Sequence, residues 1–196
     1  MESVGEELIR SALHDTANLL SGIRGILDLS DPQRPLSARD RERLDAVLKE
    51  GLAMVNRTRH IAMGSLPDRL SESPRTWAPA LREQLEPLSR VFRAPIEVSC
   101  DVPASQPVPG PYLRDFAHAM ARLLLPYAGE EGLKVRCRKE GASWILEFEP
   151  AEAVPDSLSP ATVRKDIAAR WICHLRDQLG FQIEHQDLVL KATLRA

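Results

Sequence analysis

Apolar residues in the first third of the chain recur at steps of three and four, a spacing typical of amphipathic helices. The pattern predicts a first helix over residues 6–29, and the prolines of the linker 30–36 cannot continue it. Ser37 then offers an N-cap, with Asp40 three residues later, for a second helix to about Met63. Two long helices joined by a short loop form an antiparallel hairpin.

Each predicted helix carries an apolar stripe. The first stripe consists of Ile9, Leu13, Ala17, Leu20, Ile23 and Leu27, and the second of Leu44, Val47, Leu48, Gly51, Met54, Val55, Thr58, Ile61 and Ala62. One hairpin has too little surface to bury both stripes, whereas pairing with a second copy gives a four-helix bundle. We therefore expect a homodimer; the alternative is that the two helices pack on the rest of the same chain.

After residues 64–76, which are rich in Ser, Pro, Gly and charge and are interpreted as a linker, helices and strands alternate. The pattern predicts helices over 78–92, 111–127 and 160–179, strands over 96–102, 133–139 and 143–149, and a last hairpin over 181–195 that turns around Gln186-Asp187. This order indicates an α/β sandwich with an antiparallel or mixed sheet. The expected fold class is α+β, with a hairpin domain over 1–66 and a sandwich domain over 75–196.

The composition is that of an ordinary globular protein, with 43% hydrophobic and 28% charged residues in 196. A net charge of −2 gives no global field for nucleic acid or an acidic membrane. Cys100, Cys137 and Cys173 lack CxxC spacing, which argues against zinc and against a disulfide framework. The acidic N-terminus and the absence of an 18-residue apolar run predict a cytoplasmic protein without a membrane span.

Other residues with characteristic chemistry have structural interpretations. The three tryptophans, Trp77, Trp144 and Trp171, are expected in the core or at domain contacts. Four histidines, His60, His118, His174 and His185, are scattered without the spacing of metal ligands. We therefore expect no metal site on this chain.

His14 is the strongest candidate for chemistry. Imidazole is a competent phosphorus nucleophile near neutral pH, and the adjacent Asp15 can hold one ring nitrogen as N–H while the other attacks. Asn18 lies one turn further along the same helical face and can reach the same group. The alternative is a surface histidine beside an acid that is there by coincidence.

The run His14-Asp15-Thr16-Ala17-Asn18 resembles the phosphoacceptor motif of sensor histidine kinases: a histidine, an acid, two variable residues and then Asn or Thr. The order of elements is also similar to that of their catalytic core, a dimerisation hairpin followed by an ATP-binding sandwich. This resemblance implies that His14 is the phosphorylated residue and that Asp15 assists proton handling. It also implies that Asn18 positions water in the reverse, dephosphorylating reaction.

The second domain departs from an active kinase in three places. The helix that corresponds to the family's asparagine-rich helix, residues 113–124, has no asparagine. No glycine follows the strand, over 148–155, where the family has an Asp-x-Gly-x-Gly loop. A glycine-rich lid is also missing from 156–160. The loss of all three features argues against ATP binding.

The chain therefore resembles the kinase-derived dimeric histidine phosphotransferases, which relay phosphoryl groups between receiver domains of response regulators. The resemblance implies no cofactor on this chain, because Mg²⁺ and charge stabilisation come from the partner receiver. Two alternatives stay open: a divergent histidine autokinase that retains nucleotide binding, and a non-catalytic dimeric adaptor.

Residues around His14 are candidates for partner binding: Arg10, Ser11, Ser21, Gly22 and Gly25. Arg10 lies one turn before His14 and can offset phosphoryl charge, or it is simply solvated. Glycine in a helix interior costs about 1 kcal/mol, so some compensating feature is expected at Gly22 and Gly25. Close approach of a partner helix and tight packing within the bundle are both consistent with it.

Overall fold

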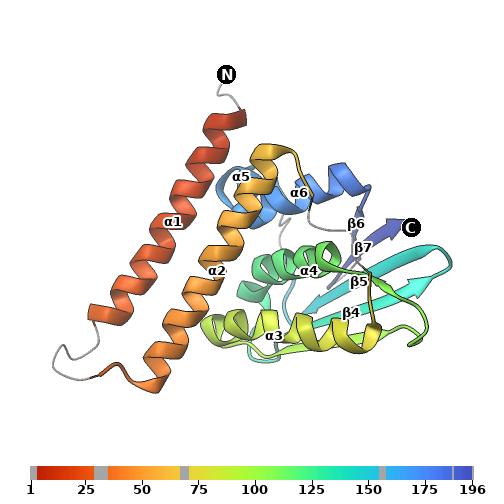
Figure 1. Cartoon of the computed structure of the whole chain (residues 1–196), viewed down its shortest axis with the longest axis horizontal. Coiled ribbons are helices and arrows are strands. Elements are labelled where there is room, and N and C mark those ends of the chain that lie inside the picture. The colour runs from red at the N-terminus through yellow and green to blue at the C-terminus, as the bar shows by residue number, and fades with distance from the viewer. Residues whose placement is uncertain (1–3, 29–34, 67–70, 155–157, 187, 196) are drawn as a thin grey trace.

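A computed structural model describes residues 4–28, 35–66, 71–154, 158–186 and 188–195. The chain begins with two long helices, α1 (Val4–Asp28) and α2 (Ala38–Met63), which lie side by side and antiparallel (Figure 1). Ser37 caps α2 as predicted, because its hydroxyl accepts the N–H of Asp40 at 3.1 Å. Residues 30–34, most of the predicted linker, lie outside the described residues.

The second half of the chain is a sandwich of helices on one sheet. Its helices are α3 (Pro74–Phe92), α4 (Pro111–Leu124), the short 3-10 helix η1 (Leu125–Tyr127), α5 (Pro160–Lys165) and α6 (Ile167–Leu179). Helix α3 begins four residues earlier than predicted, because the Ser73 hydroxyl accepts the N–H of Arg75 and Pro74 suits the first helical position.

The sheet has five strands in the order β2-β4-β5-β7-β6. Their bounds are β2 (Ile96–Asp101), β4 (Leu133–Glu140), β5 (Ser143–Pro150), β6 (Gln182–Gln186) and β7 (Val189–Arg195). Strands β2 and β4 are parallel and the other pairs are antiparallel, so the sheet is mixed. Asp187, at the predicted final turn, lies outside the described residues.

Two further strands, β1 (Ser71–Glu72) and β3 (Val108–Pro109), were not predicted. They pair antiparallel, so the stretch interpreted as a linker is tied to the loop before α4. Each strand has only two residues, which is too short for a period-2 pattern to be recognised in the sequence.

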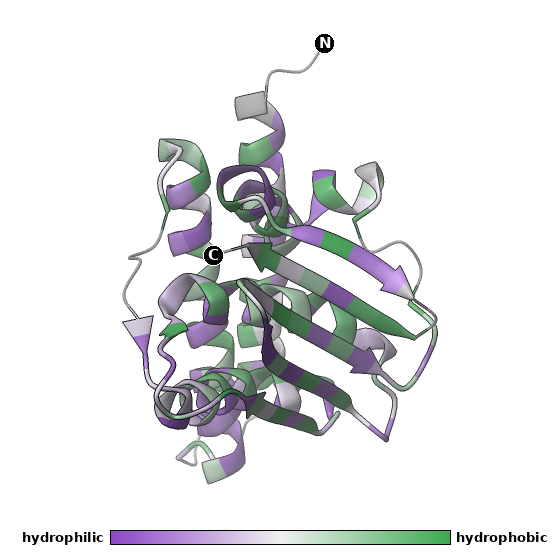
Figure 2. Ribbon diagram, turned by 90° about the vertical axis from the view of Figure 1, so that its right-hand side faces the viewer, coloured by the Kyte–Doolittle hydropathy of each residue, from purple (hydrophilic) through white to green (hydrophobic). Residues whose placement is uncertain are grey.

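Helices cover one face of the sheet, and the other face is open (Figure 2). Along the strands, hydrophobic and hydrophilic residues alternate, so each strand turns one side towards the helices. The core between the layers contains Phe116 and Phe148 together with the three tryptophans, all of them buried. The prediction of buried tryptophans is confirmed.

The predicted single helix over 160–179 is wrong. It breaks at Asp166, whose backbone is extended (φ −122°, ψ 123°) and whose side chain accepts the N–H groups of Ala168 and Ala169. A carboxylate that binds the free N–H groups of a helix end starts a new helix. The chain therefore has a separate helix α6, whose N-terminus faces α1.

The hairpin leaves apolar side chains uncovered by its own chain. Ile9, Leu13, Leu20 and Leu27 of α1 are exposed, and so are Leu48, Leu52, Val55 and Met63 of α2. The rest of the chain covers only part of the predicted stripes: Met54 is buried and Ile61 packs against the core of the sandwich. We call these eight side chains the hairpin's apolar face.

No helix in the described segments is long and apolar enough to cross a bilayer. All three cysteines are free thiols, and Cys100 lies opposite Cys137 on the neighbouring strand.

Candidate functional site

His14 projects from the first half of α1 with 57% of its side chain exposed. Its Nδ1 lies 3.0 Å from Oδ1 of Asp15. An ionised carboxylate only accepts hydrogen bonds, so Nδ1 carries the proton and donates it to Asp15. The lone pair of the neutral ring is then on Nε2, the nitrogen that Asp15 does not hold.

Asp15, by contrast, is 3% exposed. Its second carboxylate oxygen, Oδ2, accepts the backbone N–H of Ile167 at 3.1 Å and lies 3.9 Å from Nη2 of Arg122. Both partners belong to the sandwich. Asp15 is therefore a buried acid between the hairpin and the sandwich, not a solvated helix residue.

Asn18 and Arg10 lie one turn on either side of His14, and both are exposed. Nδ2 of Asn18 is 3.4 Å from Nδ1 of His14, but both nitrogens carry hydrogens in this tautomer, so neither accepts from the other. Asp15 is thus the closer partner of that nitrogen, and Asn18 stands beside the exposed part of the ring.

Ser11 does not belong to the exposed partner-binding surface that the sequence predicted. It is buried, accepts a hydrogen bond from Nε of Arg170 at 2.9 Å, and donates to the carbonyl of Arg164. Glu7, one turn earlier, pairs with Arg170 at 3.5 Å. This side of α1 is committed to α5 and α6, which helical periodicity within α1 alone does not reveal.

Ser21, Gly22 and Gly25 are exposed on α1 beyond His14. A Cβ atom added at Gly22 or Gly25 meets no heavy atom within 4 Å. Packing within the described chain therefore does not require glycine at either position. Both explanations, close approach of a partner helix and packing within a bundle formed with a second copy, involve another molecule, so both stay predictions.

Arg122 of α4 lies beside Asp15 of α1 and also contacts α2 and the N-terminus of α6. Its Nε lies 2.8 Å from Glu50 of α2, and its Nη1 lies 2.7 Å from the Asp166 carboxylate that caps α6. Burial lowers the pKa of Arg122, but Asp166, Glu50 and Asp15 outweigh burial and raise it overall. Sequence reasoning missed this arginine, because its three partners are far apart in the chain.

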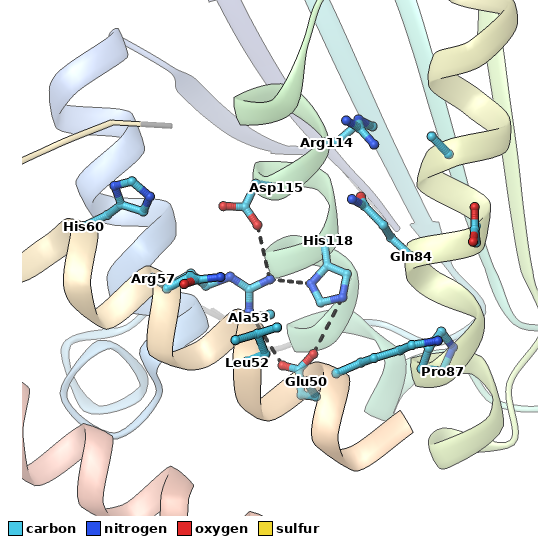
Figure 3. Close-up of a pocket in the computed structure, with 14 residues that line it drawn as sticks. Glu50, Leu52, Ala53, Arg57, His60, Gln84, Pro87, Arg114, Asp115 and His118 are labelled. Atoms are coloured by element: carbon cyan, nitrogen blue, oxygen red, sulfur yellow. Dashed lines mark hydrogen bonds and ion pairs between the residues drawn. The ribbon is translucent and has the colours of Figure 1, made fainter. Parts of the chain in front are cut away.

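A second buried cluster links α2 to α4 (Figure 3). Arg57, with 2% of its side chain exposed, donates to Nδ1 of His118 and lies 3.6 Å from both Glu50 and Asp115. Burial, followed by the charges of Arg57 and Arg122, lowers the pKa of His118 well below its ordinary value. His118 is therefore neutral near pH 7, with its proton on Nε2 facing Glu50 at 3.6 Å.

Burial also raises the pKa of Glu50, although Arg57 and Arg122 act in the opposite direction. The cluster borders a hollow of about 720 Å³ between α2, α3 and α4.

The sequence contained a signal for this cluster. Glu50 and Arg57 are seven residues apart beside the apolar stripe of α2, where charged residues need buried partners. Within the described residues, no group of three or more His, Cys, Asp or Glu side chains is placed to hold a metal ion.

No protein-family model matches this chain, and no curated protein matches it in sequence. Its structure is similar to that of the histidine kinase AdeS of Acinetobacter baumannii, at 13% identity and a TM-score of 0.59 over 92% of this chain and 94% of that chain. It is also similar to a bacterial phosphotransferase, at 13% identity and a TM-score of 0.53 over 98% of this chain and 97% of the other.

A third similar structure is the histidine kinase ThkA in complex with the response regulator protein TrrA. It is 12% identical, with a TM-score of 0.52 over 93% of this chain and 59% of that chain. Together these likenesses show that the chain has a histidine-kinase-like fold, with helices and a mixed sheet as the sequence predicted.

Proposed function

We propose that this chain is a histidine phosphotransferase that relays phosphoryl groups between receiver domains in two-component signalling. The observation that carries the proposal is the geometry of His14, an exposed imidazole with Nδ1 at 3.0 Å from a buried carboxylate. The similar bacterial phosphotransferase, matched over nearly the full length of both chains, supports the same class.

The proposed reaction needs little covalent machinery on this chain. Nε2 of His14 attacks the phosphorus of a receiver's aspartyl phosphate, the P–O bond breaks, and its electrons remain on the receiver's carboxylate. The phosphorylated ring carries positive charge, which ionised Asp15 stabilises across the Nδ1–H bond. A second receiver then takes the group by the reverse steps.

The partner in this proposal is a response-regulator receiver domain, which supplies Mg²⁺ and stabilises the transferring group. The similar kinase ThkA is itself in complex with a response regulator. Ser21, Gly22 and Gly25 are small and exposed two to three turns beyond His14 on α1, and Arg10 adds positive charge. Ser11 is left out of this surface because it is buried.

The proposal includes no ATP site on this chain. The polar side of α4, the helix compared with the kinases' asparagine-rich helix, includes Asp115, His118 and Arg122. These side chains pair with Arg57 and Glu50 of α2, so they are engaged within the chain. This favours a relay protein over a divergent autokinase that retains nucleotide binding.

The proposal also includes a homodimer. The eight side chains of the hairpin's apolar face lie on two adjacent helices and are exposed. A contiguous apolar surface of this kind marks a protein interface. A second copy of the hairpin presents the same surface, so two copies bury it together as a four-helix bundle.

The test is a transfer assay with a panel of receivers carrying ³²P on their aspartate. We expect label on the wild type and none on His14→Gln, while labelled ATP alone leaves both unlabelled. Labelling by ATP alone would favour the autokinase. A wild type that stays unlabelled with every receiver would favour the non-catalytic adaptor.

A further inference from the structure

The two carboxylate oxygens of Asp15 face different domains. Its Oδ1 faces the imidazole of His14 at 3.0 Å, and its Oδ2 faces the sandwich. There Oδ2 accepts the N–H of Ile167 at 3.1 Å and lies 3.9 Å from Nη2 of Arg122. The orientation of Asp15, and with it the hydrogen bond to His14, is thus set from the sandwich.

Arg122 is the group that ties these contacts together. In its planar guanidinium, Nε lies 2.8 Å from Glu50 and Nη1 lies 2.7 Å from Asp166, whereas Nη2 faces Asp15 at 3.9 Å, an ion pair longer than a hydrogen bond. A guanidinium holds its donors in a fixed fork, so the two short contacts fix the position of Nη2, the nitrogen that faces Asp15. Because Asp166 caps α6, Arg122 also anchors the helix end that presents the Ile167 N–H.

We infer that Arg122 is a positioning residue for phosphoryl acceptance by His14 and acts through Asp15. The inference rests on the proposed phosphotransfer function. Arg122 touches neither His14 nor a phosphoryl group. It holds the carboxylate that keeps the proton on Nδ1, and this leaves the lone pair on Nε2, the nitrogen that must meet phosphorus.

The experiment measures the His14 tautomer and the transfer rate in Arg122→Gln, in the full-length protein. Arg114→Gln is the matched control, since Arg114 lies two turns earlier on α4 and is ion-paired with Glu72 at 2.6 Å, away from Asp15. ¹⁵N NMR of the imidazole reports which ring nitrogen carries the proton. Thermal unfolding verifies that both variants fold.

We expect Arg122→Gln to move the His14 proton from Nδ1 towards Nε2 and to slow acceptance from a phosphorylated receiver by about tenfold or more. Arg114→Gln should keep the wild-type tautomer and a rate within about twofold of wild type. If either readout in Arg122→Gln stays at the level of the control, the inference is overturned.

Two further variants separate positioning from loss of structure. Arg122→Lys keeps the charge but has all its donors on one nitrogen, so it cannot reproduce the planar fork, and it should shift the tautomer and the rate in the same direction by less. In an Asp15→Asn background, Arg122→Gln should slow transfer no further, because the carboxylate through which Arg122 acts on His14 is already absent. Additive losses in that background would contradict action through Asp15.

The tautomer measurement needs no receiver, so it separates this inference from the proposed function. A wild type that takes no phosphoryl group defeats the function. A wild type that takes it, with an unchanged tautomer in Arg122→Gln, defeats only the role of Arg122.

Discussion

At the scale of single residues, His14 and Asp15 are neighbours in the chain but lie in opposite environments. His14 is mostly exposed, whereas Asp15 is buried and binds the backbone N–H of Ile167. Truncating His14 changes an exposed surface, whereas truncating Asp15 leaves the buried N–H of Ile167 without a partner.

We therefore predict that Asp15→Ala lowers the free energy of unfolding by about 1–3 kcal/mol, the cost of one unsatisfied buried group. His14→Ala should change it by less than about 0.5 kcal/mol, as for other exposed positions. Chemical denaturation of both variants measures this difference. Equal effects would mean that the sandwich does not hold Asp15 in solution.

Gly22 provides a second residue-scale prediction, because a Cβ there meets nothing within the described chain. Gly22→Ala should raise the free energy of unfolding by up to about 1 kcal/mol through helix propensity. It should nevertheless slow phosphotransfer, since a receiver helix must approach closely at this point. The control is Gly51→Ala on α2, whose Cβ faces Leu19 at 3.4 Å inside the hairpin. An unchanged transfer rate in Gly22→Ala would argue against docking at this surface.

The residues of the candidate site could be predicted only in part. A histidine and an adjacent acid are visible in the sequence, and so is an amide one turn later. The burial of Ser11 and Asp15 could not be predicted, since it depends on where α5 and α6 dock against α1. Helical periodicity defines the sides of one helix and does not say which side another domain will cover.

At the scale of elements, the break at Asp166 matters most, since it creates the helix end that binds Asp15. The sequence suggested a continuous helix because Val163, Ile167 and Trp171 keep the helical spacing across the break. Asp166 itself is a good N-cap residue, but in the middle of a periodic pattern it is equally compatible with an exposed helix position. Only the tertiary contact with Arg122 distinguishes these cases.

The contact between α2 and α4 should make stability depend on pH through His118. Because its pKa is lowered below the ordinary 6.5, the unfolded chain takes up a proton as pH falls through 6.5 while the folded chain does not. Stability contributed by neutral His118 is therefore present above pH 6.5 and is lost on acidification. The limit for one proton is about 1.4 kcal/mol per pH unit.

We predict that His118→Gln has a shallower loss of unfolding free energy than the wild type between about pH 7.5 and 5.5. Glu50 opposes the trend, because its raised pKa lets the folded chain bind a proton first, so slopes are compared rather than absolute values. Denaturation at several pH values supplies these slopes, with the exposed His185→Gln as control. A slope identical to that of the wild type would mean that His118 is not a buried neutral histidine.

At the scale of the whole molecule, the hairpin's apolar face predicts association. We expect a mass of twice 21.9 kDa in sedimentation experiments. Leu52→Glu combined with Val55→Glu should shift the protein to a single chain, because charges in an apolar interface are not compensated. Lys49→Glu makes the same change of two charge units on α2 at an exposed position outside the eight apolar side chains, and should leave the dimer intact. A wild type that sediments as one chain would contradict the four-helix bundle.

The order of hairpin and sandwich followed from hydrophobic periodicity, because α1, α2 and the central strands each repeat their pattern over many residues. The relative orientation of the hairpin and the sandwich could not be predicted in this way. It depends on the long-range pairs of Arg57 with Asp115 and of Arg122 with Asp15. The position of a charged residue beside an apolar stripe indicates that it needs a partner, but not which distant residue supplies it.

Locating the phosphoryl group tests phosphoryl acceptance by His14 most directly. The protein is incubated with a phosphorylated receiver, the modified residue is found by mass spectrometry, and ³¹P NMR distinguishes the two ring nitrogens. We predict one phosphoryl group, on Nε2 of His14, that Asp15→Asn slows and His14→Gln abolishes. Phosphoryl transfer to another residue, or to Nδ1 of His14, would contradict the chemistry proposed for this site.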